Sequence, residues 1–366
     1  KNIDKDINIY FVGFSEEDSL LDLAKQYNKT NEKINVEVVT ATDRPDLVEK
    51  YGIETSSQGI IVESGEKNKV LATSDLYTYD YSTYIAEEKL TAAIKSVTVD
   101  KLPKVYFLSG YSSLSLNNGM QYLNMYLQNE VNEVETLDIL SKGKVPDDCD
   151  TLVITSPEQD FDDIATNAIA EYINKGGNIL WLNGAIVQNK DLPNINKILA
   201  MYGVNPFGVG IIRETESSKM VSDSPDLIMP EIQYAEVTNK LQDSQGVIFI
   251  NATKINNISD EELETLNITK TELVKTSENA YFRTNFENTA NGIQEGEEKG
   301  AFVVGAQFDK IITEANEEAG TKEIASTLII YGENYFVSDY QLNQSSYTPM
   351  IAYRQNKVLV LNSIAF

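Results

Sequence analysis

The sequence predicts an α/β protein divided into two domains, the second of which is built on a mostly parallel sheet. The first reason is length, because 366 residues exceed one ordinary core and two or three domains are expected. The second is composition, since hydrophobic residues make up 42% and aromatic residues 9% of the chain, as in globular proteins. The third is the alternation of short apolar segments with longer amphipathic ones, which is typical of strands alternating with helices.

Residues 1–100 predict a thioredoxin-like domain with the element order βαβαββα. Strands are expected at 7–13, 34–40, 58–64 and 69–74, and helices at 15–29, 45–53 and 86–97. Ser15 is the expected N-cap of the first helix, and Gly65-Glu66 the hairpin turn between the last two strands. The tyrosine-rich stretch 77–84 is expected to connect two elements and to use its aromatic rings for packing.

The N-terminal domain is expected to lack redox activity. A thioredoxin-like enzyme needs a cysteine thiolate at the start of the first helix. Here residues 13–18 read GFSEED, which holds no cysteine and carries acids that would disfavour a thiolate. The stretch YGIETSSQGIIV resembles the thioredoxin segment with a cis-proline, and Ser57 falls about where that proline would be. Only the scaffold is expected to be retained.

Residues 103–366 predict the second domain, with Pro103 at its boundary. Strands are expected at 104–110, 134–139, 150–157 and 178–183, and helices at 116–131, 160–177 and 191–204. Asp160 is the expected N-cap of the helix at 160–177, which ends at a pair of glycines. This alternation predicts a parallel sheet covered by helices on both faces.

The sequence pattern changes in residues 205–325 and predicts a β-rich insertion or subdomain. Polar, strand-like pieces at 245–253 and 301–309 alternate there with acidic loops, and 295–300 is an expected solvated turn between strands. After this block, 326–339 and 357–366 look like buried strands. They are predicted to complete the sheet that begins at residue 104.

The composition excludes several classes of function. There is no histidine, so serine–histidine–aspartate, cysteine–histidine and histidine-based metal sites are all ruled out. The lone Cys149 cannot form an internal disulfide. A net charge of −26 argues against nucleic acid and against anionic lipid as partners. No GxGxxG or Walker A sequence occurs, so no nucleotide cofactor is expected and any ATPase is another subunit.

Polar residues come directly after the predicted parallel strands, at the edge where open α/β sheets bind ligands. Gathered in one crevice, they would suit a polar ligand such as a sugar or a peptide end. The alternative interpretation is that they are turn residues suited to the backbone geometry. The candidate ligand-binding residues are Tyr111, Ser112, Ser156, Glu158, Asn183, Glu333 and Asn334.

The same strand ends do not predict an enzyme or a metal site. A Ser156 nucleophile would lack a histidine base, and Cys149 precedes its strand, at the wrong end of the sheet. Glu158 and Glu333 would suit glycoside hydrolysis only if they stood about 5–10 Å apart, which keeps a divergent hydrolase as an alternative. The aspartates at 160–163 lack the glycine and terminal glutamate of a calcium loop and are expected to cap a helix.

Most of residues 103–366 resembles the auxiliary component of ABC transporters related to the gliding-motility system. The resemblance rests on KVYFLSGY, DTLVITSPEQDF, YINKGGNILWL and LPNINKILAMYGV in this order, with later pieces such as MPEIQYAEVTNKL and IIYGENYFVSD. It implies a flavodoxin-like or glutamine-amidotransferase-like sheet without that enzyme's catalytic set. Tyr111 and Tyr234-Ala235 stand where the family often has histidines, so no role of those histidines transfers.

The resemblance also implies the function and its setting. We expect a non-catalytic, extracytoplasmic module that binds a partner subunit, an envelope component or a substrate beside a separate ABC permease and ATPase. No run of about 18 apolar residues occurs. Both ends look cut close to structured elements, so any membrane helices are expected in segments outside this chain. A stand-alone sugar- or peptide-binding domain is the alternative.

Overall fold

The computed structural model of the protein describes residues 5–54, 57–78, 81–185, 187–188, 190–241, 246–287, 292–316, 320–342 and 348–366. Residues 55, 56, 79, 80 and 245, which fall within segments interpreted from the sequence, lie outside the described residues. The chain forms two compact units. The first comprises Lys1–Pro103 and Asn124–Glu133, and the second comprises Lys104–Leu123 and Val134–Phe366.

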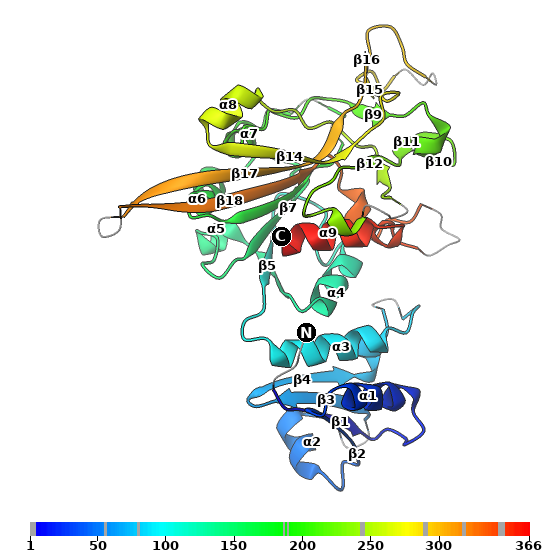
Figure 1. The fold of residues 1–366 in the computed structure, drawn as a ribbon. Coiled ribbons are helices and arrows are strands. Elements are labelled where there is room, and N and C mark those ends of the chain that lie inside the picture. Colours follow the sequence, from blue (N-terminus) through cyan, green and yellow to red (C-terminus); the bar gives the residue numbers. More distant parts are fainter. Residues whose placement is uncertain are drawn as a thin grey trace. The chain divides into compact units, whose positions relative to one another are not determined.

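The first unit contains a four-stranded sheet in the order β2-β1-β3-β4 (Figure 1). The strands are β1 (Ile7–Val12), β2 (Ile34–Val39), β3 (Gly59–Ser64) and β4 (Lys67–Ala72). The helices are α1 (Ser19–Thr30), α2 (Pro45–Tyr51) and α3 (Ala86–Thr98). Strand β1 pairs in parallel with β2 and antiparallel with β3, and β3 and β4 form a hairpin. The element order is the one expected from the sequence.

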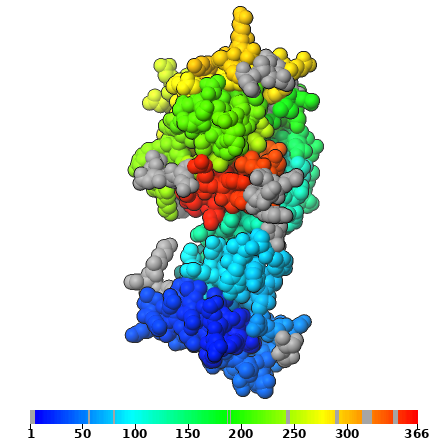
Figure 2. Space-filling model, turned by 90° about the vertical axis from the view of Figure 1, so that its right-hand side faces the viewer, coloured from blue at the N-terminus to red at the C-terminus, as the bar shows by residue number. Residues whose placement is uncertain are grey.

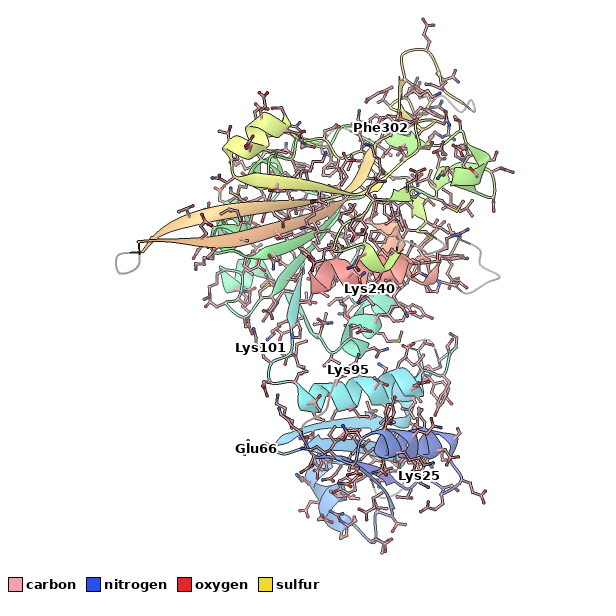
Figure 3. All side chains as sticks on the ribbon, viewed as in Figure 1. Lys25, Glu66, Lys95, Lys101, Lys240 and Phe302 are labelled. Carbon is pink, nitrogen blue, oxygen red and sulfur yellow. The ribbon has the colours of Figure 1, made fainter. Side chains whose placement is uncertain are left out.

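The continuous apolar run in β3 gives this sheet an apolar surface on both faces, because successive residues of a strand point to opposite faces. Leu21 of α1 and Leu90 of α3 join one buried cluster with Ile9 of β1. Leu47 of α2 belongs to a second cluster on the opposite face, with Ile61 of β3. Charged side chains stay outside these clusters, as Lys25 and Glu66 do in Figure 3.

One detail of the first unit differs from expectation, and a second agrees with it in part. The N-cap of α1 is Asp18, whose side chain accepts a hydrogen bond from the Leu20 amide at 2.9 Å, so the prediction of Ser15 is wrong. Both residues have side chains suited to capping, and only the position of the first helical turn distinguishes them. Tyr77 and Tyr84 pack edge to face with ring centroids 5.1 Å apart, but both are exposed.

The second unit is built on an eight-stranded sheet in the order β12-β14-β17-β18-β8-β7-β5-β6. The strands are β5 (Lys104–Leu108), β6 (Glu133–Leu137), β7 (Thr151–Thr155), β8 (Asn178–Leu182), β12 (Glu231–Ile232), β14 (Ile268–Lys275), β17 (Val303–Asn316) and β18 (Gly320–Tyr331). Strands β5, β7, β8 and β18 run parallel. In chain order, β6-β5-β7-β8-β18 reads 2-1-3-4-5, an order found in doubly wound sheets. The α/β prediction is confirmed.

Helices cover both faces of the parallel strands. The helices of the second unit are α5 (Ile139–Lys142), α6 (Asp163–Asn174), α7 (Pro193–Ala200), α8 (Asp260–Thr265) and α9 (Asn356–Ala365), whereas most of α4 (Gln121–Asn129) belongs to the first unit. Helices α6 and α7 bury Ile169 and Ile198 against the sheet face that carries Trp181. Helix α9 lies against the other face, where the Thr151 hydroxyl donates to the Ile364 carbonyl at 3.2 Å.

The C-terminal segment corrects one prediction. Residues 357–366 were expected to form a buried strand, but they belong to helix α9. The buried side chains Leu359, Val360, Ser363 and Ile364 recur at helical spacing. A short apolar run that is buried reads alike for a strand and a helix, which explains the error.

The capping of α6 and α7 corrects a second prediction. The N-cap of α6 is Asp162, which accepts from the Ala165 amide at 2.9 Å, whereas Asp160 was expected there. Asp160 instead accepts hydrogen bonds from the amides of Asn194 and Ile195, in the first turn of α7. The two aspartates therefore cap two different helices.

Residues 205–325 supply strands to the large sheet and to two small ones. Strands β12, β14 and β17 extend the parallel strands through antiparallel pairs. Beyond Lys310, β17 pairs with β18 alone, so the two strands project as a ribbon (Figure 1). The remaining strands are β9 (Ile211–Arg213), β10 (Met220–Val221), β11 (Ser224–Ile228), β13 (Phe249–Ile250), β15 (Tyr281–Arg283) and β16 (Glu298–Lys299). The gold segment next to β16 projects from the surface in Figure 2, whereas β15 itself is buried.

Candidate functional site

The carboxyl ends of the parallel strands lie at one edge of the sheet, as the sequence predicts. Hydrogen bonds continue past the strands themselves, since the Ser156 amide donates to the Leu182 carbonyl and the Asn183 amide to the Tyr331 carbonyl. The loops after β7, β8 and β18 therefore start side by side. Some of their polar side chains bond to the protein itself, and others line an open pocket.

At the end of β5, Tyr111 is buried rather than open to a ligand. Its hydroxyl donates to the carboxylate of Asp162, the N-cap of α6. Its ring meets the Phe161 ring edge to face, with centroids 4.9 Å apart. Burial, together with the hydrogen bond to Asp162, raises the pKa of Tyr111 well above its usual range. Tyr111 fixes the loop after β5 to the start of α6.

The loops after β5 and β7 are joined by hydrogen bonds. The Glu158 carboxylate accepts from both the amide and the hydroxyl of Ser113, and the Glu158 amide donates to the Tyr111 carbonyl at 2.7 Å. The bonds from Ser113 lower the pKa of Glu158. Ser112 accepts from the Leu114 amide at 3.1 Å, in a local turn. The crevice between β5 and β7, where the strand order reverses, is closed by the protein's own groups.

At the end of β18, Glu333 is 1% exposed and serves the backbone. Its carboxylate accepts from the amides of Ile250 at 3.3 Å, Tyr335 at 3.0 Å and Phe336 at 2.8 Å. Burial raises the pKa of Glu333 to about 8. The neighbouring Asn334 is also buried, and its Oδ1 has no hydrogen-bond partner among the described residues. Neither side chain lines the open pocket.

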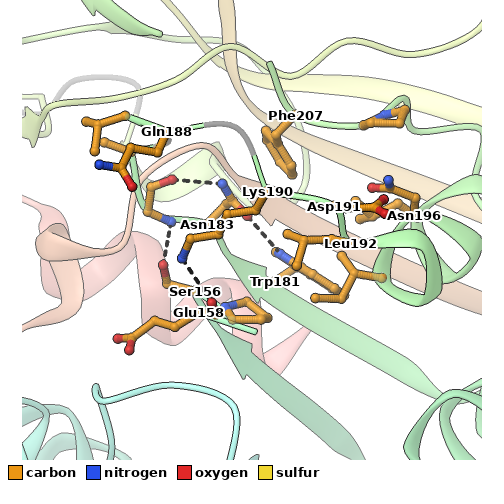
Figure 4. Close-up of a pocket in the computed structure, with 17 residues that line it drawn as sticks. Ser156, Glu158, Trp181, Asn183, Gln188, Lys190, Asp191, Leu192, Asn196 and Phe207 are labelled. Carbon is orange, nitrogen blue, oxygen red and sulfur yellow. Dashed lines mark hydrogen bonds between the residues drawn. The ribbon is translucent and has the colours of Figure 1, made fainter. Parts of the chain in front are cut away.

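An open pocket of about 710 Å³ lies beyond β7 and β8 (Figure 4). We call it the α7 pocket because α7 and the segments before and after it form one wall. Its volume falls within the range of small-molecule sites. It is lined by Ser156, Pro157, Glu158, Trp181, Asn183, Gly184, Ala185, Val187, Gln188, Lys190, Asp191, Leu192, Ile195, Asn196, Leu199, Pro206 and Phe207.

The floor of the α7 pocket is held by a short chain of hydrogen bonds. The Trp181 indole Nε1 donates to Asn183 Oδ1 at 3.4 Å, and Asn183 Nδ2 donates to the Gly184 carbonyl at 2.8 Å. The Gly184 amide donates to the Ser156 hydroxyl at 3.0 Å. Ser156 has a φ of 30°, an uncommon conformation for a residue with a side chain. The floor is therefore fixed before any ligand arrives.

The structure brings together only some of the predicted site residues. Ser156, Glu158 and Asn183 line the α7 pocket. Tyr111, Ser112, Glu333 and Asn334 do not line it. The sequence reasoning missed Trp181 and Phe207, and it missed the contribution of α7. Trp181 was recognised only as part of a buried strand, although its position next to the end of that strand could have indicated the site.

The described residues contain no arrangement typical of metal binding or nucleophilic catalysis. They include no group of three or more acidic or cysteine side chains placed to hold a metal ion. Within the same residues, the Ser156 hydroxyl makes one hydrogen bond, which it accepts from Gly184. Cys149 lies before β7, away from the pocket, and burial raises the pKa of its thiol to about 11. Among the described residues, no helix has the length and apolar character needed to span a membrane.

Strand order, helices on both faces and a pocket at the carboxyl edge define the second unit as an α/β protein of the doubly wound type. Residues 102–207 match the family described as ABC-type uncharacterized transport system, which agrees with the resemblance noted in that part of the sequence. The matched segment runs from the residues just before β5 to Phe207. Every residue that lines the α7 pocket lies within it.

Other comparisons give weaker similarity. Fifteen chains of solved structures match the fold. One of them, titled mmIFT52 N-terminal domain, is 15% identical, with a TM-score of 0.46 over 72% of this chain and 97% of that chain. No curated protein matches the sequence.

Proposed function

We propose that the chain is a non-catalytic, extracytoplasmic module of an ABC transport complex, in which it binds a substrate, an envelope component or a partner subunit. One observation carries the proposal. The segment matched to the transport-system family contains all the residues that form the α7 pocket. The part of the chain that is similar to the family is thus the part that forms the pocket.

The geometry of the α7 pocket supports binding without catalysis. A serine nucleophile needs a base within hydrogen-bond reach. The chain has no histidine, and among the described residues Ser156 has no carboxylate or amine at its hydroxyl. The carboxylates Glu158 and Glu333 are each held by protein donors, and only Glu158 lines the pocket. A divergent hydrolase is therefore disfavoured.

Purification of the full-length natural protein from membranes tests the transport assignment. We expect an ABC permease and an ATPase to co-purify with it in a mild detergent, whereas an unrelated membrane protein carrying the same tag recovers neither. Recovery of the protein alone, at detergent concentrations that keep other ABC transporters assembled, would reject the proposal.

Protease protection tests the proposed location. In sealed membrane vesicles whose outer face is exposed, added protease should digest the region described here, and inverted vesicles should protect it. The reverse pattern would place the region in the cytoplasm and contradict the proposal.

A stand-alone ligand-binding domain is the second candidate, and the openness of the α7 pocket favours it. A pocket of about 710 Å³ with both polar and apolar lining residues suits a small molecule without any transporter subunit. Ligand binding by a protein that never associates with a permease would support this candidate over the first.

A further inference from the structure

We propose that the α7 pocket binds a neutral saccharide. The inference rests on the proposed binding role and names the ligand class for that site. Four features of the pocket lead to it: the occupied N-terminus of α7, an apolar wall, polar side chains that make no hydrogen bond to another described residue, and strands without a free edge.

Anionic ligands are disfavoured because the usual anion site is already filled. The N-terminus of a helix attracts phosphate or carboxylate groups through its free amides. In α7, the Asp160 carboxylate accepts from the Asn194 amide at 3.0 Å and from the Ile195 amide at 2.9 Å. Among the described residues, the only cation that lines the pocket is Lys190, which donates to the Glu158 carbonyl at 2.9 Å. A phosphorylated ligand would find no free pair of amides there.

One wall of the pocket is apolar and includes aromatic rings. It consists of Trp181, Leu192, Ile195, Leu199, Pro206 and Phe207. The Trp181 side chain is fully buried behind this wall and fixed by its hydrogen bond to Asn183, so Phe207, which is half-buried and packs on the core beneath, is the aromatic ring exposed at the pocket. Flat apolar surfaces of this kind fit the C–H faces of a sugar ring, because sugars combine an apolar face with hydroxyl groups at the edge.

The pocket also offers polar groups that the described part of the protein leaves unused. The side chains of Gln188, Asp191 and Asn196 make no hydrogen bond to another described residue. Each amide offers both donors and an acceptor, and the carboxylate accepts. A hydroxyl group both donates and accepts, so a polyhydroxylated ligand can satisfy all three without bringing a charge.

A peptide is the less suitable ligand because the neighbouring strands have no free edge. Extended peptides commonly bind by adding a strand to an exposed sheet edge. Strand β7 is paired with β5 and β8, and β8 is paired with β7 and β18. The main-chain groups that would hold a peptide are already used.

Trp181 makes the test direct, because it is the one tryptophan of the chain and it lines the pocket. We would titrate the protein with glucose, maltose, cellobiose and diacetylchitobiose and monitor tryptophan fluorescence, with calorimetry as a second measurement. At least one sugar should give a saturable change with a 1:1 stoichiometry. Glucose 6-phosphate should bind more weakly than glucose, and trialanine should give no saturable change.

Variants assign the binding to the pocket. Phe207→Ala and Asn196→Ala should each raise the Kd by about tenfold, roughly the loss of one stacking or hydrogen-bonding contact. Phe286→Ala is the matched control, because Phe286 is 37% exposed and lies outside the pocket lining. It should leave the Kd unchanged. Circular dichroism and melting curves of the variants exclude loss of fold as the cause.

The outcomes separate this inference from the proposed function. If no sugar gives a saturable signal by fluorescence or calorimetry, or if trialanine or glucose 6-phosphate binds instead, the saccharide assignment is wrong even when permease and ATPase co-purify. Sugar binding that both pocket variants leave unchanged would also reject it. Sugar binding without co-purification would support the ligand class and reject the transport assignment.

Discussion

The strand ends of the second unit fall into two groups that look alike in sequence and differ in structure. After β5 and β18, polar side chains bond to the protein itself, with Tyr111 held by Asp162 and Glu333 by three backbone amides. After β8, the chain opens into the α7 pocket, whose polar side chains include Gln188 and Asn196. A polar residue at a strand end therefore predicts a site only when no nearby backbone group needs it.

The physical reason lies in the segment that comes after each strand. After β18 a short 3-10 helix begins at Tyr335, and its first amides need acceptors, which Glu333 supplies. After β8 the chain runs to α7, whose first amides are satisfied by Asp160 from another loop. Since α7 is capped from outside, Gln188 and Asp191, which lie between β8 and α7, make no hydrogen bond to another described residue.

The largest expected effect is a pH dependence of the free energy of unfolding that comes from Glu333. This residue follows β18, one of the strand ends whose polar side chains bond to the protein itself. Its folded pKa of about 8 lies above its unfolded value of 4.5, so folding takes up a proton between these pH values. The stabilisation is fully present below pH 4.5 and is lost as pH rises through 8, up to about 5 kcal/mol in the free energy of unfolding. Urea unfolding at pH 5 and pH 8.5 measures this loss.

Substitution separates Glu333 from other titrating groups, including Asp339, whose pKa burial also raises. Glu333→Gln should flatten much of the pH dependence, whereas Glu236→Gln, a change at an exposed glutamate, should leave it as in the wild type. An unchanged slope in Glu333→Gln would mean that the carboxyl group is ionised and hydrated, and the distinction between closed and open strand ends would fail at β18.

The second prediction concerns Tyr111 at the other closed end. Tyr111→Ala should lower the free energy of unfolding by about 3–5 kcal/mol, because it removes a buried ring that packs on Phe161. Tyr111→Phe keeps the ring and should lower it by about 1 kcal/mol through the lost bond to Asp162. Chemical denaturation measures both. A stable Tyr111→Ala protein would show that this strand end is not structural.

Much of the fold was predictable because it depends on local pattern. Apolar strands and amphipathic helices gave the α/β class and the position of the strand ends. Helix α9 was missed because its apolar run has no polar face to distinguish a helix from a strand, and its buried residues include Ser363. The N-caps were misplaced by a few residues since several candidates such as Asp160 and Asp162 stand close together.

The site was predictable only in part, because its use of side chains depends on distant partners. The Glu333 carboxylate accepts a hydrogen bond from the amide of Ile250, which is far from it in sequence. The residues around Glu333 give no indication of that contact. Trp181 and Phe207 face one pocket only because β8 and the segment after α7 meet in space. Sequence alone placed Ser156, Glu158 and Asn183 at the right edge, and tertiary contacts decided the rest.

The third prediction tests how tightly the pocket floor is built. A Cβ atom at Gly184 would lie 2.5 Å from the Ser156 hydroxyl and 3.4 Å from the Asn334 amide. Gly184→Ala should therefore lower the free energy of unfolding by about 1–3 kcal/mol, through crowding. Ser156→Gly removes the hydroxyl and relieves the backbone at a φ of 30°.

A double-mutant cycle decides whether the two positions interact. The combined variant should be more stable than the sum of the single changes predicts, because glycine at 156 leaves room for the new methyl group. Thermal and urea unfolding of the four proteins give the coupling. Strict additivity would show that the floor adjusts freely and is not fixed before a ligand binds.

The smallest expected effect comes from the exposed link between the loops after β5 and β7. Glu158→Ala should lower the free energy of unfolding by about 1 kcal/mol or less, because the bonds from Ser113 are exposed to solvent. Ser113 lowers the pKa of Glu158 below 4.5, so this contribution is present above pH 4.5 and is lost as pH falls through the folded pKa. The difference in unfolding free energy between wild type and Glu158→Gln should therefore narrow in acid.

Substitution of Ser113, which donates to the Glu158 carboxylate, tests whether the crevice between β5 and β7 and the α7 pocket are independent. Ser113 lies outside the pocket lining, whereas Glu158 touches both regions. If the two regions are independent, Ser113→Ala should leave the Kd of a ligand bound in the α7 pocket unchanged. It should lower the free energy of unfolding by about as much as Glu158→Ala does. A Kd that changes with Ser113→Ala would show that the crevice between β5 and β7 is coupled to the pocket, so that breaking the loop link alters both.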